Sequence, residues 1–182
     1  DLFPCPSGPG DLGFRPESAD GTTRTAPPDK EPSMSDTSQG CVLCTSDRDQ
    51  EEILWRNASC RIVLVDDDDY PGYCRVVLRR HIPEMTDLAP AERGSLMEIV
   101  FGVEAALRET LRPDKINLAS LGNQTPHLHW HVIPRWRNDR CFPDPIWAPA
   151  RRHPALARPA ADSEALRRAL ILHLGPPEDD AP

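Results

Sequence analysis

Apolar residues gather in three short runs between residues 50 and 80, and each run predicts a β-strand. The runs are bounded by Gly, Pro, Asn, Ser or Asp, which favour turns. They cover residues 53–56, 60–65 and 73–78. Asn57-Ala58-Ser59 separates the first two runs, so we expect these two strands to form a hairpin.

A long helix is predicted for residues 90–111, because apolar residues recur there at spacings of three and four. These residues are Leu96, Ile99, Val100, Val103, Leu107 and Leu111. Pro90 suits the first helical turn, where its missing amide hydrogen has no intrahelical partner. Arg112-Pro113 ends the segment. We also expect a strand at residues 115–121 and a short amphipathic helix at residues 162–174.

His127, His129 and His131 alternate with apolar residues in the stretch 127–134. Side chains of a β-strand point alternately to its two faces, so this stretch predicts a strand with three imidazoles on one face and apolar side chains on the other. Together the elements predict an α+β domain, with an antiparallel sheet of about five strands and a helix on one face.

The 182 residues carry a formal net charge of -8. This acidic balance argues against binding of extended nucleic acid, which needs a basic face. No apolar run approaches the roughly 20 residues that cross a bilayer, and the N-terminus lacks the pattern of a signal peptide. We therefore expect a soluble, cytoplasmic protein with no membrane partner.

The two ends of the chain differ from its middle in proline content and in apolar periodicity. Residues 1–40 hold seven prolines and little apolar periodicity, so they should be disordered. Met34 stands just ahead of the first globular pattern, and one hypothesis is that it is the natural start. We expect a globular domain over residues 41–147, followed by a proline-rich tail, residues 148–182, that contains the short helix.

Six cysteines include one closely spaced pair, Cys41 and Cys44. Without an export signal, a disulfide framework is not expected in a chain of this length. The Cys-x-x-Cys spacing therefore favours a metal or redox element.

The stretch 127–133, His-Leu-His-Trp-His-Val-Ile, resembles the signature of the histidine triad (HIT) superfamily. The resemblance extends over roughly residues 41–147. It includes the early cysteine pair, an acidic turn before Pro71, Arg80-His81 at a strand end and Asn117 ten residues before the first histidine. The sequence is most similar to bacterial HIT proteins described as diadenosine tetraphosphate hydrolase-like, and the resemblance implies a HIT-like fold.

This resemblance implies a nucleotide hydrolase or transferase that cleaves at the α-phosphate of a nucleotide conjugate, either a dinucleoside polyphosphate or a nucleoside phosphoramidate. By position, His129 would attack the α-phosphorus and form a covalent nucleotidyl-histidine. His131 would lie beside the phosphate or the leaving group. The implied chemistry needs no cofactor.

Further roles follow from the resemblance. Asn117, Asn123 and Gln124 would bind phosphate, and Asp66 would bind the nucleoside. Family members commonly carry Gln at the position of Asn123, followed by Ser or Thr, so the phosphate loop departs from the family pattern here. HIT proteins of this size often form C2 homodimers through the long helix and a sheet edge.

A structural zinc ion is a further implication, because the family's ligand positions fall on Cys41, Cys44, His81 and His127. Two thiolates and two imidazoles can form a closed tetrahedral site. The alternative is that both cysteines are free thiols and His81 lies at the surface.

Two other functions fit the histidine pattern. A His-x-His pair on a strand can bind catalytic zinc in a metal-dependent hydrolase. A nucleotide-binding regulatory protein could keep the same pocket with little turnover.

Overall fold

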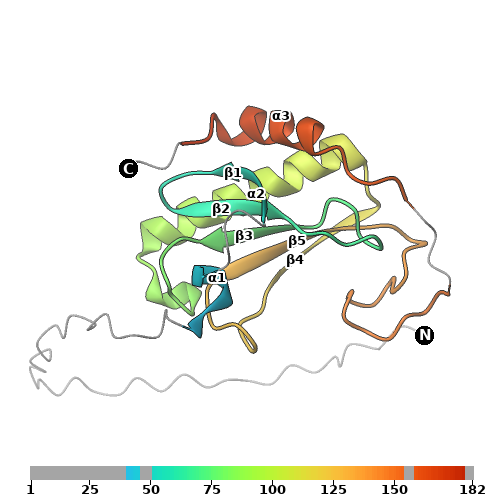
Figure 1. Ribbon diagram of the computed structural model, residues 1–182, viewed down its shortest axis with the longest axis horizontal. Helices are drawn as coiled ribbons and strands as arrows, with labels where there is room; N and C mark the ends of the chain where they lie inside the picture. The colour runs from blue at the N-terminus through green and yellow to red at the C-terminus, as the bar shows by residue number, and fades with distance from the viewer. Residues whose placement is uncertain (1–39, 46–50, 154–157, 179–182) are drawn as a thin grey trace, which may run out of the picture. The chain divides into compact units, whose positions relative to one another are not determined.

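Among the residues that the computed structural model describes, 40–45, 51–153 and 158–178, five strands form one antiparallel sheet (Figure 1). Their order across the sheet is β1-β2-β3-β5-β4. The strands are β1 (Glu52–Arg56), β2 (Cys60–Leu64), β3 (Cys74–Leu78), β4 (Lys115–Ser120) and β5 (His129–Arg135). The predicted α+β class with about five antiparallel strands is confirmed.

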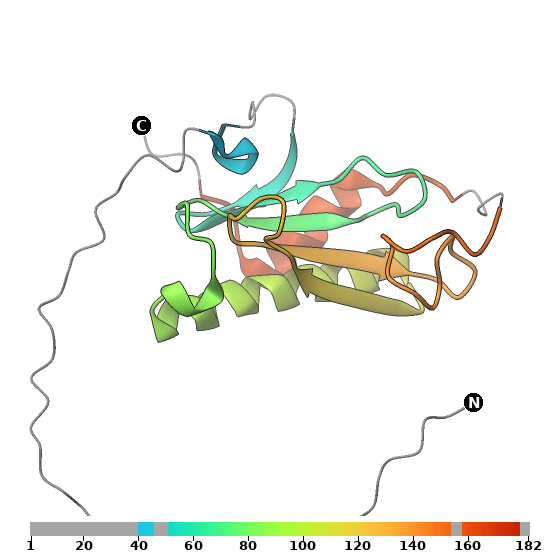
Figure 2. The same cartoon turned by 90° about the horizontal axis from the view of Figure 1, so that it is seen from below.

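Two helices, α2 (Pro90–Leu111) and α3 (Ser163–Leu174), pack against each other and against the sheet. Figure 2 shows both on the same side of the sheet, with the short helix α1 (Val42–Thr45) on the opposite side. A 3-10 turn, η2 (Met85–Asp87), precedes α2. Within the described part of the chain, no helix is long and apolar enough to cross a membrane.

All described residues belong to one unit of the chain, Ser35–Pro182. The Met34 hypothesis and the predicted disorder of the N-terminal segment lie outside the described residues. The same is true of positions 154–157 in the predicted proline-rich connector.

Alternation of side chains gives the sheet two different faces. Ile62, Val76 and Val132 are fully buried in one cluster with apolar residues of α2 and α3. On the opposite face, Arg75 of β3 stands directly across from His131 of β5. Helices α2 and α3 therefore cover the apolar face of the sheet and do not cover the face that bears His131.

The ends of α2 agree with the signals in the sequence. Pro90 occupies the first turn, and the Glu92 carboxylate accepts a hydrogen bond from the Ala89 amide at 2.9 Å. At the other end Arg112 adopts the left-handed conformation, with φ of 47°. This conformation, together with the proline that follows, stops the helix.

The histidine strand begins later than predicted. We expected it to start at His127, but β5 starts at His129. The amide of His127 donates to Thr125 at 2.8 Å, and the amide of Leu128 donates to Ile82 at 2.7 Å. Because both amides bond outside the β5 ladders, His127 lies just outside the regular strand. The bounds of the other predicted elements agree within one residue.

Helix α3 packs on its own domain. Asp162 caps its N-terminus by accepting a hydrogen bond from the Ala165 amide at 3.0 Å. Leu166 and Leu170 are each 1% exposed and join the main core cluster. Leu172, on the opposite side of the helix, is 73% exposed.

This difference along α3 predicts that Leu170→Ala lowers the free energy of unfolding by about 2–5 kcal/mol, because it removes buried methyl groups and leaves a cavity. The matched substitution Leu172→Ala should change it by less than about 0.5 kcal/mol. Urea unfolding followed by circular dichroism measures both. Equal effects of the two variants would contradict the observed packing of α3.

Candidate functional site

His129 and His131 lie side by side on β5, with ring centroids 4.8 Å apart and planes at 71°. Both are nearly buried, at 7% and 5% exposed. Tyr73, Arg75 and Trp147 lie around His131, and we call these five residues the histidine site. Tyr73 precedes β3, Arg75 is part of β3, and Trp147 follows β5 along the chain.

The ring orientation of His129 is set by a backbone carbonyl. Its Nδ1 atom lies 2.6 Å from the carbonyl oxygen of His127. A carbonyl can only accept a hydrogen bond, so Nδ1 must carry the hydrogen. In the neutral ring the Nε2 atom then keeps a free lone pair, which is the form that a nucleophile or a metal ligand requires.

His131 is held by a different partner. Its Nδ1 atom is in hydrogen-bond contact with the hydroxyl of Tyr73, which is 3% exposed. Burial lowers the pKa of His131 to about 4, and the nearby His129 and Arg75 act in the same direction. His131 is therefore neutral at pH 7, and it can donate one hydrogen bond without adding positive charge.

Arg75 and Trp147 complete the surroundings of His131. The guanidinium carbon of Arg75 lies 5.7 Å from the centre of the Tyr73 ring. The Trp147 ring stands edge-on to His131, at 5.3 Å and 76°, and this side chain is 53% exposed. Trp147 therefore lies at the edge of the histidine site.

Tyr73 and Arg75 were not identified from the sequence. They alternate with Cys74 and Val76, which are buried in the core. Because neighbouring residues of a strand face opposite ways, this alternation places Tyr73 and Arg75 on the face away from the core. Strand parity alone could have placed them on this face, but their position beside His131 depends on the pairing of β3 with β5.

A buried ion pair organises the segment that carries Trp147. Arg135 and Asp139 are 1% and 3% exposed, and Arg135 Nε donates to Asp139 Oδ2 at 2.7 Å. Arg135 also donates to the Asp144 carbonyl at 2.8 Å. Burial acts to raise the pKa of Asp139, but hydrogen bonds from Arg135 and from backbone amides outweigh it, so the pKa is lowered. The carboxylate stays charged and anchors the turn after β5.

Asn117 is hydrogen-bonded to the buried ion pair of Arg135 and Asp139 through Arg135. Its cross-strand neighbour is Ile133, so it lies on the face that bears His131. The Asn117 Oδ1 atom accepts a hydrogen bond from Arg135 Nη1 at 2.6 Å. This contact leaves the amide nitrogen of Asn117 as its free donor.

The other predicted binding residues lie on loops. Asn123 and Gln124 are exposed between β4 and β5, ahead of His127. Asp66 is exposed after β2 and lines a cavity of about 670 Å³. Arg75 lines the same cavity, whereas His129 and His131 do not.

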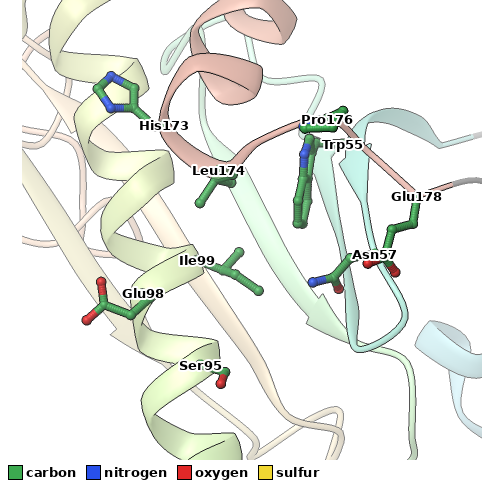
Figure 3. Close-up of a pocket in the computed structure, with 9 residues that line it drawn as sticks. All are labelled: Trp55, Asn57, Ser95, Glu98, Ile99, His173, Leu174, Pro176 and Glu178. Atoms are coloured by element: carbon green, nitrogen blue, oxygen red, sulfur yellow. The ribbon is translucent and has the colours of Figure 1, made fainter.

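A second cavity, of about 440 Å³, lies on the helix side of the sheet. Figure 3 shows Trp55, Ile99 and Leu174 around it. The Trp55 indole donates to the Gly175 carbonyl at 2.9 Å. His173 also lines this cavity and contacts Glu109 at 3.0 Å. None of the predicted site residues lines it.

Cys41, Cys44, His81 and His127 form a separate cluster, in which the candidate ligand atoms all lie within 4.8 Å of one another. The Nδ1 atom of His127 lies 3.4 Å from Cys41 Sγ and 3.3 Å from Cys44 Sγ. Its Nε2 atom donates to the Leu78 carbonyl at 2.7 Å, which leaves the Nδ1 lone pair pointing at the sulfurs. The donor set and this ring orientation fit a tetrahedral metal ion.

Cys44 and His127 of this cluster are both shifted toward their neutral forms. Burial, followed by the hydrogen bond and charge of Cys41, raises the pKa of Cys44 to about 11. Burial is also the largest cause that lowers the pKa of His127. The imidazole is therefore ready to bind a metal at neutral pH, whereas the thiols lose their protons when the metal arrives.

The lowered pKa of His131 predicts that stability depends on pH. In the unfolded chain this residue titrates near 6.5, and in the folded state near 4. Below pH 6.5 the unfolded state binds more protons, so the free energy of unfolding should fall as the pH is lowered from about 6.5 toward 4. The contribution of His131 between pH 7 and pH 5 should be on the order of 2 kcal/mol.

Urea unfolding at several pH values, for the wild type and for His131→Asn, measures this contribution. The variant should show a shallower dependence, because Asn does not titrate. Identical slopes for the two proteins would mean that His131 is not held neutral by the fold.

Curated proteins resemble part of the chain. AP-4-A phosphorylase from Mycobacterium tuberculosis is 32% identical over 78 residues, which are 40% of each chain. An asymmetrical bis(5'-nucleosyl)-tetraphosphatase from Schizosaccharomyces pombe is 30% identical over 74 residues, covering 38% of this chain and 41% of that protein. The chain therefore matches about two fifths of the length of these relatives.

Solved structures and a family model cover more of the chain. A histidine triad protein from Bradyrhizobium japonicum superposes with a TM-score of 0.57 at 28% identity, over 69% of this chain and 95% of that protein. The model of the HIT domain matches residues 47–138, half of the sequence, including all three histidines of the motif. With its alternating histidines on the open face of a five-stranded sheet, this chain belongs to the HIT family.

Proposed function

We propose that this protein is a nucleotidyl hydrolase or transferase that cleaves a nucleotide conjugate at its α-phosphate through a covalent intermediate on His129. The observation that carries the proposal is the 2.6 Å hydrogen bond from His129 Nδ1 to the His127 carbonyl, which leaves Nε2 as a nucleophile. Both reported curated relatives are named as enzymes of dinucleoside tetraphosphates, which supports a dinucleoside polyphosphate as the substrate class. A nucleoside phosphoramidate is the other class.

The reaction has two displacement steps. In the first, the Nε2 lone pair of His129 forms a bond to the α-phosphorus, and the bond from phosphorus to the leaving group breaks with its electron pair on that group. In the second, water attacks the same phosphorus, and the phosphorus–nitrogen bond breaks with its electron pair returned to His129. The proton of the water passes to solvent, and the nucleotide is released.

Charge develops on the phosphoryl oxygens in both steps and needs donors placed beforehand. His131 and the Arg75 guanidinium are proposed to supply them on the histidine face. As His129 forms its new bond, its ring becomes positively charged, and the His127 carbonyl stabilises that charge by accepting from Nδ1.

Phosphate and nucleoside binding are assigned to neighbouring residues. Asn117 would donate from its amide nitrogen, since its oxygen accepts from Arg135. Asn123 and Gln124 would reach the phosphates from the exposed loop that precedes the histidines. Asp66 would bind the nucleoside from the cavity that it shares with Arg75.

We also propose a structural zinc ion held by Cys41, Cys44, His81 and His127. Such an ion would join α1, the end of β3 and the start of the histidine stretch, and its role would be stability rather than chemistry. A homodimer through α2 and the edge strand β4 is proposed from the family resemblance.

The proposed mechanism predicts that His129→Ala lowers turnover at least about 10³-fold while nucleotide binding is retained, because the substitution removes the nucleophile and leaves the cavity in place. The measurement is release of mononucleotide from a panel of dinucleoside polyphosphates and adenosine phosphoramidates. His173→Ala, on the helix side of the sheet, is the matched control and should keep wild-type turnover.

Two results would count against the mechanism. Unchanged turnover in His129→Ala would exclude the nucleotidyl-histidine. Tight nucleotide binding without turnover of any panel member by the wild type would favour a regulatory nucleotide-binding protein.

The zinc proposal predicts about one zinc ion per chain in protein purified without chelator. Cys44→Ala should lose most of this zinc and lower the melting temperature, because one of four ligands is gone. Cys74→Ala is the control, since this thiol lies in the main core cluster and should affect stability without affecting zinc content. Metal analysis that finds far less than one zinc per wild-type chain would remove the proposal.

A further inference from the structure

Tyr73 is a buried residue of the histidine site, and its hydroxyl has no role in the two proposed displacement steps. It is 3% exposed, and its phenol contacts Nδ1 of His131. The backbone holds it firmly, because its amide donates to the Tyr70 carbonyl at 3.0 Å and its carbonyl accepts from the Val65 amide at 2.8 Å. Gly72, with φ of 83°, makes the turn that brings Tyr73 to this position.

The direction of the contact with His131 follows from the need of the buried Tyr73 hydroxyl for an acceptor. A phenol can donate one hydrogen bond and can also accept. The Tyr73 side chain is buried, so its phenolic hydrogen needs an acceptor. Among the described residues, His131 Nδ1 is the acceptor in hydrogen-bond contact with this hydroxyl. The nearby Arg75 guanidinium, with its carbon 5.7 Å from the centre of the Tyr73 ring, has donors only and cannot accept this hydrogen. The phenol therefore donates to His131 Nδ1.

A hydrogen bond received at Nδ1 determines where His131 carries its own hydrogen. The neutral ring has a single N–H group, and with Nδ1 as the acceptor this group must be at Nε2. His129 shows the opposite arrangement, with its hydrogen on Nδ1 toward the His127 carbonyl. The two neighbouring imidazoles therefore offer a lone pair at one Nε2 and a hydrogen at the other.

We propose that Tyr73 is a positioning residue that holds His131 in the tautomer with its hydrogen on Nε2, so that His131 donates to the phosphate or leaving group beside His129. The catalytic consequence rests on the proposed function. In the opposite tautomer His131 would present a lone pair to an anionic phosphate and would repel it.

Tyr70 provides a matched control for Tyr73. It packs in the same cluster, together with Ile133, and is also 3% exposed. An arginine lies over its ring as well, with the guanidinium carbon of Arg135 at 5.6 Å. The two tyrosines therefore have similar burial and surroundings, but the hydroxyl of Tyr73 is the one in contact with His131.

The test compares Tyr73→Phe and Tyr70→Phe with the wild type by nitrogen-15 NMR of the histidine rings, which distinguishes the two neutral tautomers. The wild type and Tyr70→Phe should show His131 with its hydrogen on Nε2. Tyr73→Phe should show a mixture of tautomers. With a substrate of the panel, kcat of Tyr73→Phe should fall about 10-fold with KM nearly unchanged, in line with the loss of one hydrogen bond.

The proposal is overturned if wild-type His131 carries its hydrogen on Nδ1, or if Tyr73→Phe leaves the tautomer unchanged. The wild-type spectrum decides the first point even if a variant fails to fold. The NMR measurement needs no substrate, so its outcome is independent of turnover. If His129→Ala keeps full turnover while Tyr73→Phe changes the tautomer, the proposed mechanism fails and the assignment of Tyr73 stands.

Discussion

The register between β3 and β5 is the constraint on which the rest of the structure depends. It sets Arg75 across from His131, Val77 across from His129 and Val76 across from Trp130. A slip by one residue would turn every side chain of a strand to the other face, so the core and the histidine site would be lost together. The apolar residues under α2 and α3 resist that slip because they are fully buried. Hydrophobic packing on one face therefore maintains the geometry of the histidine site on the other.

Three histidines of one motif have three different environments. His127 lies just before the strand, with one nitrogen on the Leu78 carbonyl and the other facing two thiols. His129 donates to the carbonyl of His127, and His131 contacts the hydroxyl of Tyr73. In each ring one nitrogen has a fixed hydrogen-bond partner, and this partner determines whether the other nitrogen carries a hydrogen. The differences arise from those partners, since the residue type is the same.

The buried pair of Arg135 and Asp139 plays a comparable role beyond the end of the histidine strand. Burying two charges costs free energy unless hydrogen bonds satisfy them, and here the Asn117 side chain and the Asp144 carbonyl complete the set for Arg135. The pair anchors the segment that brings Trp147 to the edge of His131. One ionic network thus connects β4, β5 and the following segment at the site.

The sequence by itself determined the elements, the helix-covered face of the sheet and the motif of alternating histidines, because periods of two and 3.6 residues and turn-forming residues act locally. It also predicted that Cys41 and Cys44 would join His81 and His127, but through family resemblance. Only the tertiary structure decided that Tyr73 and Arg75 meet His131 and that the strand starts at His129. Those outcomes depend on strand register and on hydrogen bonds between residues far apart in the chain, which no local pattern encodes.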